Sequence, residues 1–123
     1  MEDLKPLVIE DDPLLILLAK TFLKQLNCQN IDVAENGEKA LEKMNLNKYD
    51  IIFMDMNLPI MNGPEISKVI RSGDSPNKET PIITVSASVS DQAKKECKDA
   101  GMNDYLTKPY SKQQMEETIH KWV

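Results

Sequence analysis

Apolar positions alternate along this chain between two spacings. Short runs rich in apolar residues, typical of strands buried in a sheet, are separated by longer stretches with helical spacing. The predicted strands are 7–9, 31–33, 51–54, 82–85 and 105–107. The predicted helices are 13–26, 36–44, 63–71, 90–100 and 111–123. This strict alternation predicts an α/β domain with a parallel sheet covered by helices on both faces.

Residues suited to helix ends stand where these helices begin and end. Asn36, Ser90 and Ser111 are N-cap residues, whose side chains accept hydrogen bonds from the first free backbone amides. Pro13 suits a first helical turn, and Gly101 suits the position just past a helix end. Because crossovers between parallel strands are right-handed, few arrangements remain. A doubly wound three-layer sandwich of five strands and five helices is the natural one.

A group of mostly polar residues follows four of the predicted strands. They are Glu10, Asp11 and Asp12 after the first, Asp55 after the third, Ser86 and Ala87 after the fourth, and Lys108 with Pro109 after the fifth. In a doubly wound sheet the carboxyl ends of the strands share one edge, and ligands bind there. We therefore expect these residues to gather at one site.

The residue types at that edge favour a metal-dependent reaction of a phosphoryl group. Crowded carboxylates are unfavourable unless a cation neutralises them, and oxygen ligands with room for water suit Mg²⁺. A hydroxyl and an ammonium suit phosphoryl oxygens, and a carboxylate can be the nucleophile that forms an aspartyl phosphate. Each residue alone has a plainer interpretation: acids at a helix N-terminus, a turn aspartate, a structural serine, a surface lysine. Their joint occurrence favours the site.

Composition narrows the functional classes. The 123 residues make one ordinary domain, 1–123, and 20 acidic against 15 basic residues give a net charge of −5. An acidic chain with 5% aromatic residues is poorly suited to binding nucleic acid. No apolar run approaches the length of a membrane span, so we expect no membrane insertion. Cys28 and Cys97 show no paired spacing, which favours reduced thiols and a cytoplasmic location.

Four segments carry a family resemblance that covers essentially the whole chain. In order they are LVIEDDPLL, IIFMDMNLPIMNG, PIITVSA and DYLTKPY. With them the chain resembles the receiver domains of two-component signalling and is similar to the chemotaxis response regulators. The resemblance implies a flavodoxin-like fold with strand order 2-1-3-4-5, as in such receivers. It also implies a phosphoacceptor signalling domain, which assists its own phosphorylation and dephosphorylation but is not an enzyme.

The resemblance assigns the acidic residues to the phosphoacceptor and to a metal. Asp55 is expected to be the phosphoacceptor. The expected Mg²⁺ ligands are Asp11 directly, Glu10 through water, Asp55, and the backbone carbonyl of Asn57. Asp12 occupies the next, more variable acidic position and is expected to contribute less.

The other matched positions are expected to bind the phosphoryl group or to respond to it. Lys108 is expected to pair with the phosphoryl oxygens, aimed inward by a cis peptide to Pro109. Ser86 supplies a hydroxyl, and Ala87 leaves backbone room beside it. Tyr105 matches the aromatic switch position, and Gly63 matches the glycine after the acceptor loop.

A change at the acceptor is expected to reach a distant surface. The new charge draws Ser86 toward the phosphoryl oxygens, and Tyr105 turns into the space that Ser86 leaves. The face expected to change is formed by helix 90–100, strand 105–107 and the last helix. Asn57 and Ser88, two positions beyond Asp55 and Ser86, are placed to orient or block the water that removes the phosphoryl group.

The implied phosphodonor is a phosphohistidine on a sensor histidine kinase or on a histidine phosphotransfer protein. Two settings stay open within the family: a stand-alone regulator, and the receiver of a hybrid sensor kinase, which the segment CKDAGMNDYLTKPY resembles more. A phosphorylation-dependent dimer also stays open. The length of the chain as given is expected to leave no room for a DNA-binding output domain.

Two other functions compete with this interpretation. A histidine phosphotransfer module would use His120, the single histidine, and would be an all-helical bundle, which the apolar runs 51–54 and 82–85 oppose. An aspartate-nucleophile phosphatase would need a second aspartate two positions after the nucleophile, where this chain has Asn57. It would also need a longer chain with a cap domain.

Overall fold

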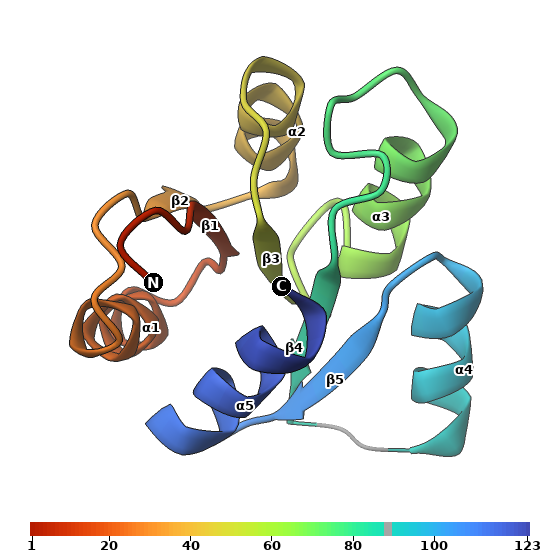
Figure 1. Ribbon diagram of the computed structural model, residues 1–123. Coiled ribbons are helices and arrows are strands. Elements are labelled where there is room, and N and C mark those ends of the chain that lie inside the picture. The colour runs from red at the N-terminus through yellow and green to blue at the C-terminus, as the bar shows by residue number, and fades with distance from the viewer. Residues whose placement is uncertain (88–89) are drawn as a thin grey trace.

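Five parallel strands form the centre of the computed structural model, which describes residues 1–87 and 90–123 (Figure 1). The strands are β1 (Pro6–Ile9), β2 (Asp32–Ala34), β3 (Ile51–Asp55), β4 (Ile82–Ser86) and β5 (Asp104–Thr107). Their order in the sheet is β2-β1-β3-β4-β5, and every pairing is parallel. The doubly wound sheet that the alternating pattern predicts is therefore confirmed, as is the strand order that the resemblance implies.

The helices cover both faces of this sheet. They are α1 (Pro13–Gln25), α2 (Gly37–Leu46), α3 (Gly63–Ser72), α4 (Asp91–Asp99) and α5 (Lys112–Trp122). Helices α1 and α5 pack on one face, and α2, α3 and α4 pack on the other (Figure 1). The predicted N-caps Asn36, Ser90 and Ser111 each accept a hydrogen bond from a backbone amide of the helix that follows.

Strands β3 and β4 are buried along their whole length, because helices cover them from both sides. Alternate residues of β3 serve the two halves of the core. Ile52 and Met54 pack under α2, α3 and α4, whereas Ile51 and Phe53 pack under α1 and α5. A strand in this position has apolar residues at consecutive positions, which explains the unbroken run before Asp55.

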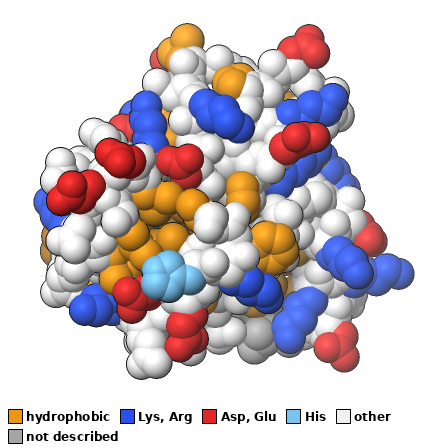
Figure 2. Space-filling view, in the orientation of Figure 1, with side chains coloured by type: hydrophobic (Ala, Val, Ile, Leu, Met, Phe, Trp, Pro, Cys, Tyr) orange, Lys and Arg blue, Asp and Glu red, His pale blue; other side chains and the backbone are white. Residues whose placement is uncertain are grey.

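The two termini lie on the same side of the molecule, beyond the amino ends of the strands (Figure 1). A hollow there of about 380 Å³ is lined by Met1, Leu4, Ile119 and His120, among others. Figure 2 shows apolar side chains gathered on this face beside the single histidine. Within the described residues, none of the helices has the length and apolar character needed to cross a membrane.

The C-terminal end of α4 is fastened to α3 by polar contacts. The buried Ser67 hydroxyl donates to the carbonyl oxygen of Ala100 at 2.7 Å, and Arg71 Nε donates to that of Gly101 at 3.0 Å. Gly101 has a φ of +86°, and a Cβ atom there would lie 2.7 Å from Arg71 Cγ. Glycine is therefore required both for the backbone conformation and for the approach of the arginine.

We expect Ser67→Ala to lower the free energy of unfolding by about 1–2 kcal/mol, because the buried carbonyl of Ala100 loses its hydrogen-bond donor. Ser72→Ala is the matched control, since Ser72 is exposed on the same helix and donates within it, to Lys68. Urea denaturation of both variants measures the difference. Equal stability of the two variants would contradict the anchoring role of Ser67.

Candidate functional site

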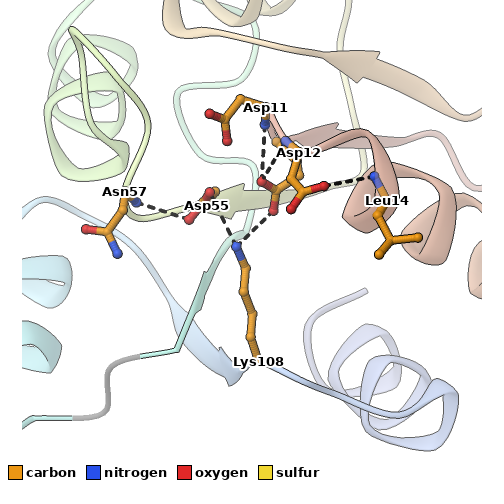
Figure 3. A network of polar contacts seen from close by, with 7 residues as sticks. Asp11, Asp12, Leu14, Asp55, Asn57 and Lys108 are labelled. Carbon is orange, nitrogen blue, oxygen red and sulfur yellow. Dashed lines mark hydrogen bonds and ion pairs between the residues drawn. The ribbon is translucent and has the colours of Figure 1, made fainter.

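The carboxyl ends of the strands bring Glu10, Asp55 and Lys108 into direct contact (Figure 3). Glu10 follows β1, Asp55 is the last residue of β3, and Lys108 follows β5. Lys108 Nζ lies 3.0 Å from Glu10 Oε1 and 3.3 Å from Asp55 Oδ2. Both carboxylates are almost completely buried. The prediction that these residues gather at one edge of the sheet is confirmed.

The register of the sheet explains this meeting. Ile9 pairs with Met54, so the residue after each of them, Glu10 and Asp55, stands side by side at the edge. Asp55 in turn pairs with Val85, which places Ser86 one step further along β4. The backbone N–H of Lys108 donates to the carbonyl of Ser86 at 2.9 Å. The Lys108–Pro109 peptide is cis, as expected.

Three carboxylates form the acidic side of the site. One oxygen from each of Glu10, Asp11 and Asp55 lies within 4.8 Å of the others. Glu10 Oε2 also accepts hydrogen bonds from the backbone amides of Asp11 and Asp12, at 3.1 and 3.3 Å, which hold its side chain in place. Glu10 is therefore a fixed part of the site and not one of several solvated acids.

Asp12 has a different role from its two acidic neighbours. Its carboxylate accepts the backbone N–H of Leu14 at 2.9 Å and is the N-cap of α1 (Figure 3). The plainer interpretation of the acidic run, an acid at a helix N-terminus, thus holds for Asp12 and fails for the buried Glu10. Its smaller part in the site agrees with the expectation from the resemblance.

The charges of the site do not balance. Burial raises the pKa of Glu10 to about 6, a rise that Lys108 opposes and the charge of Asp55 reinforces. Burial lowers the pKa of Lys108, but its contacts with the two carboxylates outweigh this effect, so the pKa is raised overall. Three carboxylates facing one ammonium leave negative charge, and an all-oxygen donor set suits a hard divalent cation such as Mg²⁺.

The loop after Asp55 is held tightly against it. The backbone N–H of Asn57 donates to Asp55 Oδ1 at 3.1 Å, and that of Gly63 donates to the carbonyl of Met56 at 3.0 Å. A Cβ atom on Gly63 would lie 2.8 Å from the carbonyl oxygen of Asp55, so a larger residue cannot pack there without displacing the backbone. The contribution of the Asn57 carbonyl to a metal site stays a prediction.

The residues expected to respond to phosphorylation lie at different depths. Ser86 is buried at the end of β4, and Ala87 follows it at the surface. Tyr105 is half-buried in the middle of β5, opposite Thr84, where it packs against the core under α2, α3 and α4. Their switching roles stay predictions. Ser88 lies outside the described residues.

Sequence reasoning assigned no role to Tyr110, which lies beside the buried carboxylates. With Glu10, Leu15, Asp55 and others it lines a cavity of about 10 Å³, close to the room needed by one water molecule. Burial and the nearby charge of Glu10 raise the pKa of Tyr110 to about 12, so its hydroxyl keeps its proton. Its ring meets that of Phe22 edge to face, with centroids 6.0 Å apart. The feature of the sequence that could have pointed to Tyr110 is its place as an aromatic residue directly after Lys108–Pro109.

We expect Glu10→Gln to raise the free energy of unfolding by about 1–2 kcal/mol in metal-free buffer near neutral pH, because it removes a poorly solvated charge. The folded protein binds this proton more tightly than the unfolded chain does. The contribution of Glu10 to stability is therefore full below pH 4.5 and is lost as the pH rises through about 6. The gap between variant and wild type should open over that interval.

Urea denaturation across this pH range measures the gap. Glu42→Gln, at an exposed position of α2, is the control for the loss of a carboxylate that is not buried. A constant difference between Glu10→Gln and the wild type at every pH would contradict the role of buried charge.

Comparison with known proteins gives consistent matches. The family model described as the response regulator receiver domain matches residues 7–120. The chain is 32% identical over 119 residues to the sensor histidine kinase GacS of Pseudomonas protegens, and the match covers 95% of this chain and 13% of GacS. The chain thus spans a small part of that relative's length.

Two solved structures resemble it closely. The receiver domain of the sensor histidine kinase PA1611 of Pseudomonas aeruginosa, solved with a magnesium ion in its active site cleft, has a TM-score of 0.88 and 28% identity, covering 97% of this chain and 96% of that one. The Saccharomyces cerevisiae Ssk1 receiver domain, co-crystallised with the histidine phosphotransfer protein Ypd1, has a TM-score of 0.86 and 27% identity, covering 97% and 88%. Because the family match runs from β1 into α5, the chain belongs to the family of response regulator receiver domains, which act in two-component and phosphorelay signalling.

Proposed function

We propose that Asp55 accepts a phosphoryl group from a phosphohistidine on a partner protein. The observation that carries this proposal is the position of its carboxylate, which lies 3.3 Å from Lys108 Nζ and beside the carboxylates of Glu10 and Asp11. An oxygen of Asp55 attacks the phosphorus atom, the bond from phosphorus to the histidine nitrogen breaks, and an acyl phosphate forms. The partner's histidine leaves as the neutral imidazole once it takes up a proton.

The proposed cofactor is Mg²⁺, held by Glu10, Asp11, Asp55 and the backbone carbonyl of Asn57. When bound, it neutralises charge on the phosphoryl oxygens. Lys108 pairs with one of these oxygens, which it can reach because its ammonium already lies between the buried carboxylates. The Ser86 hydroxyl binds another oxygen, and Ala87 leaves room for backbone contacts beside it.

Phosphorylation then shifts the balance between two conformations of the domain. Drawing Ser86 toward the acceptor opens space for Tyr105, whose side chain lies between the sheet and α4. The face formed by α4, β5 and α5 changes as Tyr105 turns, and downstream partners read the change. The composition of α4 supports this proposal. Its buried side chains, Ala93 and Cys97, are small, so they present little obstacle to a turn of the Tyr105 ring.

The donor would approach over α1. Leu14 and Leu17 lie on one face of this helix and are 71% and 61% exposed, an unusual exposure for large apolar side chains close to a charged site. The donor would be a sensor histidine kinase or a histidine phosphotransfer protein. The co-crystal of the Ssk1 receiver domain with Ypd1 supports the second class.

We further propose that residues 1–123 act as one receiver domain in the cytoplasm, without turning over a substrate of their own. The match to part of a sensor histidine kinase favours the hybrid setting over the stand-alone one, and a phosphorylation-dependent dimer is compatible with both. The histidine phosphotransfer alternative is wrong, because His120 lies on a helix of an α/β sheet fold and not in a helical bundle. The phosphatase alternative needs a second aspartate two positions after Asp55, and this chain has Asn57 at that position.

Incubation with Mg²⁺ and acetyl phosphate is expected to add one phosphoryl group to the wild type, detected as a gain in intact mass. Asp55→Asn should show no gain, because the nucleophilic carboxylate is gone. Asp12→Asn is the matched control and should be phosphorylated normally, since asparagine is also a good N-cap. Removing Mg²⁺ with EDTA should abolish the gain. An unchanged mass gain in Asp55→Asn would overturn the proposal.

A further inference from the structure

Ile60 has a backbone conformation that is rarely found for its residue type. Its φ is +69°, in the left-handed region, where a β-branched side chain clashes with its own backbone. Asn27, the other non-glycine residue with positive φ among the described residues, follows the end of α1 and is a residue that tolerates this conformation. Ile60 therefore needs an explanation that Asn27 does not.

The conformation belongs to a sharp turn in the acceptor loop, residues 56–62, which joins β3 to α3. The backbone N–H of Met61 donates to the carbonyl of Pro59 at 2.7 Å, which closes a three-residue turn centred on Ile60. The turn lets the chain fold back so that Gly63 reaches the backbone of Asp55. Loop closure thus explains the backbone of residue 60, and glycine would satisfy it without strain.

Neither the turn nor the core explains the side chain. Ile60 is fully exposed, whereas Leu58, two residues earlier in the same loop, is 6% exposed and packs in the core. An isoleucine at this position adds backbone strain and leaves a large apolar side chain in water. Strain kept at the edge of a reactive site is commonly part of its function.

The position of the loop indicates what the side chain meets. In Figure 3, Asp55 lies between Leu14 at the start of α1 and Asn57 at the start of the acceptor loop. Residues 56–62 leave Asp55 and return to its backbone at Gly63, so a protein that places a phosphorus atom against Asp55 comes close to this loop. Because Ile60 is β-branched and held outward by a tight turn, it loses little conformational freedom on binding.

We propose that Ile60 is a specificity residue for the protein phosphodonor, and that it inserts into an apolar patch beside the donor's phosphohistidine. This inference rests on the proposed function of Asp55. A small phosphodonor has no such patch, so Ile60 contributes to transfer from a protein and not to transfer from acetyl phosphate. That difference separates a docking role from a role in the chemistry.

The test compares the two kinds of donor on the same variants. The protein donor is the phosphorylated kinase or phosphotransfer protein, from the organism that carries this chain, that labels the wild type fastest. Ile60→Gly is expected to lower kcat/KM for this donor about tenfold or more, because the burial of one large aliphatic side chain is lost. Labelling by acetyl phosphate should stay within about twofold of the wild type.

Two further variants test whether the effect depends on an apolar side chain at position 60 and not on the loss of any exposed apolar residue. Ile60→Val keeps a β-branched apolar side chain and should retain transfer from the protein donor. Leu46→Ala removes a leucine that is 76% exposed at the end of α2, where the chain turns toward the amino end of β3, and should not change transfer. Ile60→Gly should unfold at the same or a higher urea concentration than the wild type, since glycine relieves the strain.

Each outcome decides between the two proposals. Unchanged transfer from the protein donor to Ile60→Gly overturns the docking role, and so does an equal loss with acetyl phosphate. If acetyl phosphate labels Asp55 but no phosphohistidine protein does, the docking role fails while the phosphoacceptor stands. If the wild type is not labelled by acetyl phosphate, the proposed function itself fails.

Discussion

An excess of buried negative charge at one edge of the sheet is the constraint on which the site depends. Glu10 and Asp55 are both buried, Asp11 adds a third carboxylate, and Lys108 supplies a single ammonium. Burial raises the pKa of Glu10, and the nearby charge of Asp55 raises it further, because the charged form of the carboxylate is poorly solvated there. A site with this imbalance favours the binding of a divalent cation, and with it the chemistry of a phosphoryl group.

The fold maintains this unfavourable cluster through the register of its strands and through backbone contacts at the sheet edge. The register of β1 against β3 sets Glu10 beside Asp55, and two backbone amides hold the Glu10 carboxylate. Gly63 packs against the backbone of Asp55, which holds the acceptor loop against the end of β3. The far end of α4 is held instead by hydrogen bonds to backbone carbonyls, from Ser67 to Ala100 and from Arg71 to Gly101.

Much of the fold could be predicted because its causes are local. A strand buried on both faces needs consecutive apolar residues, so Ile51–Met54 stands out, and N-caps need short polar side chains, so Ser111 does too. The prediction was less accurate where local causes are weak. Helix α2 continues beyond the predicted end at residue 44 to Leu46, whose exposed side chain adds nothing to the apolar stripe. The candidate site followed from the strand ends because parallel strands share one carboxyl edge.

The sequence by itself determined the succession of strands and helices along the chain, and the residue types that the edge of the sheet would carry. The tertiary structure alone decided which of those residues joins the buried cluster and which caps a helix. Glu10 and Asp12 are both acids next to the same strand, yet one is buried against Lys108 and the other caps α1. The left-handed turn at Ile60 likewise follows from closing the loop onto Gly63. Local pattern sets which element a residue belongs to, whereas charge contacts and loop closure depend on partners far away along the chain.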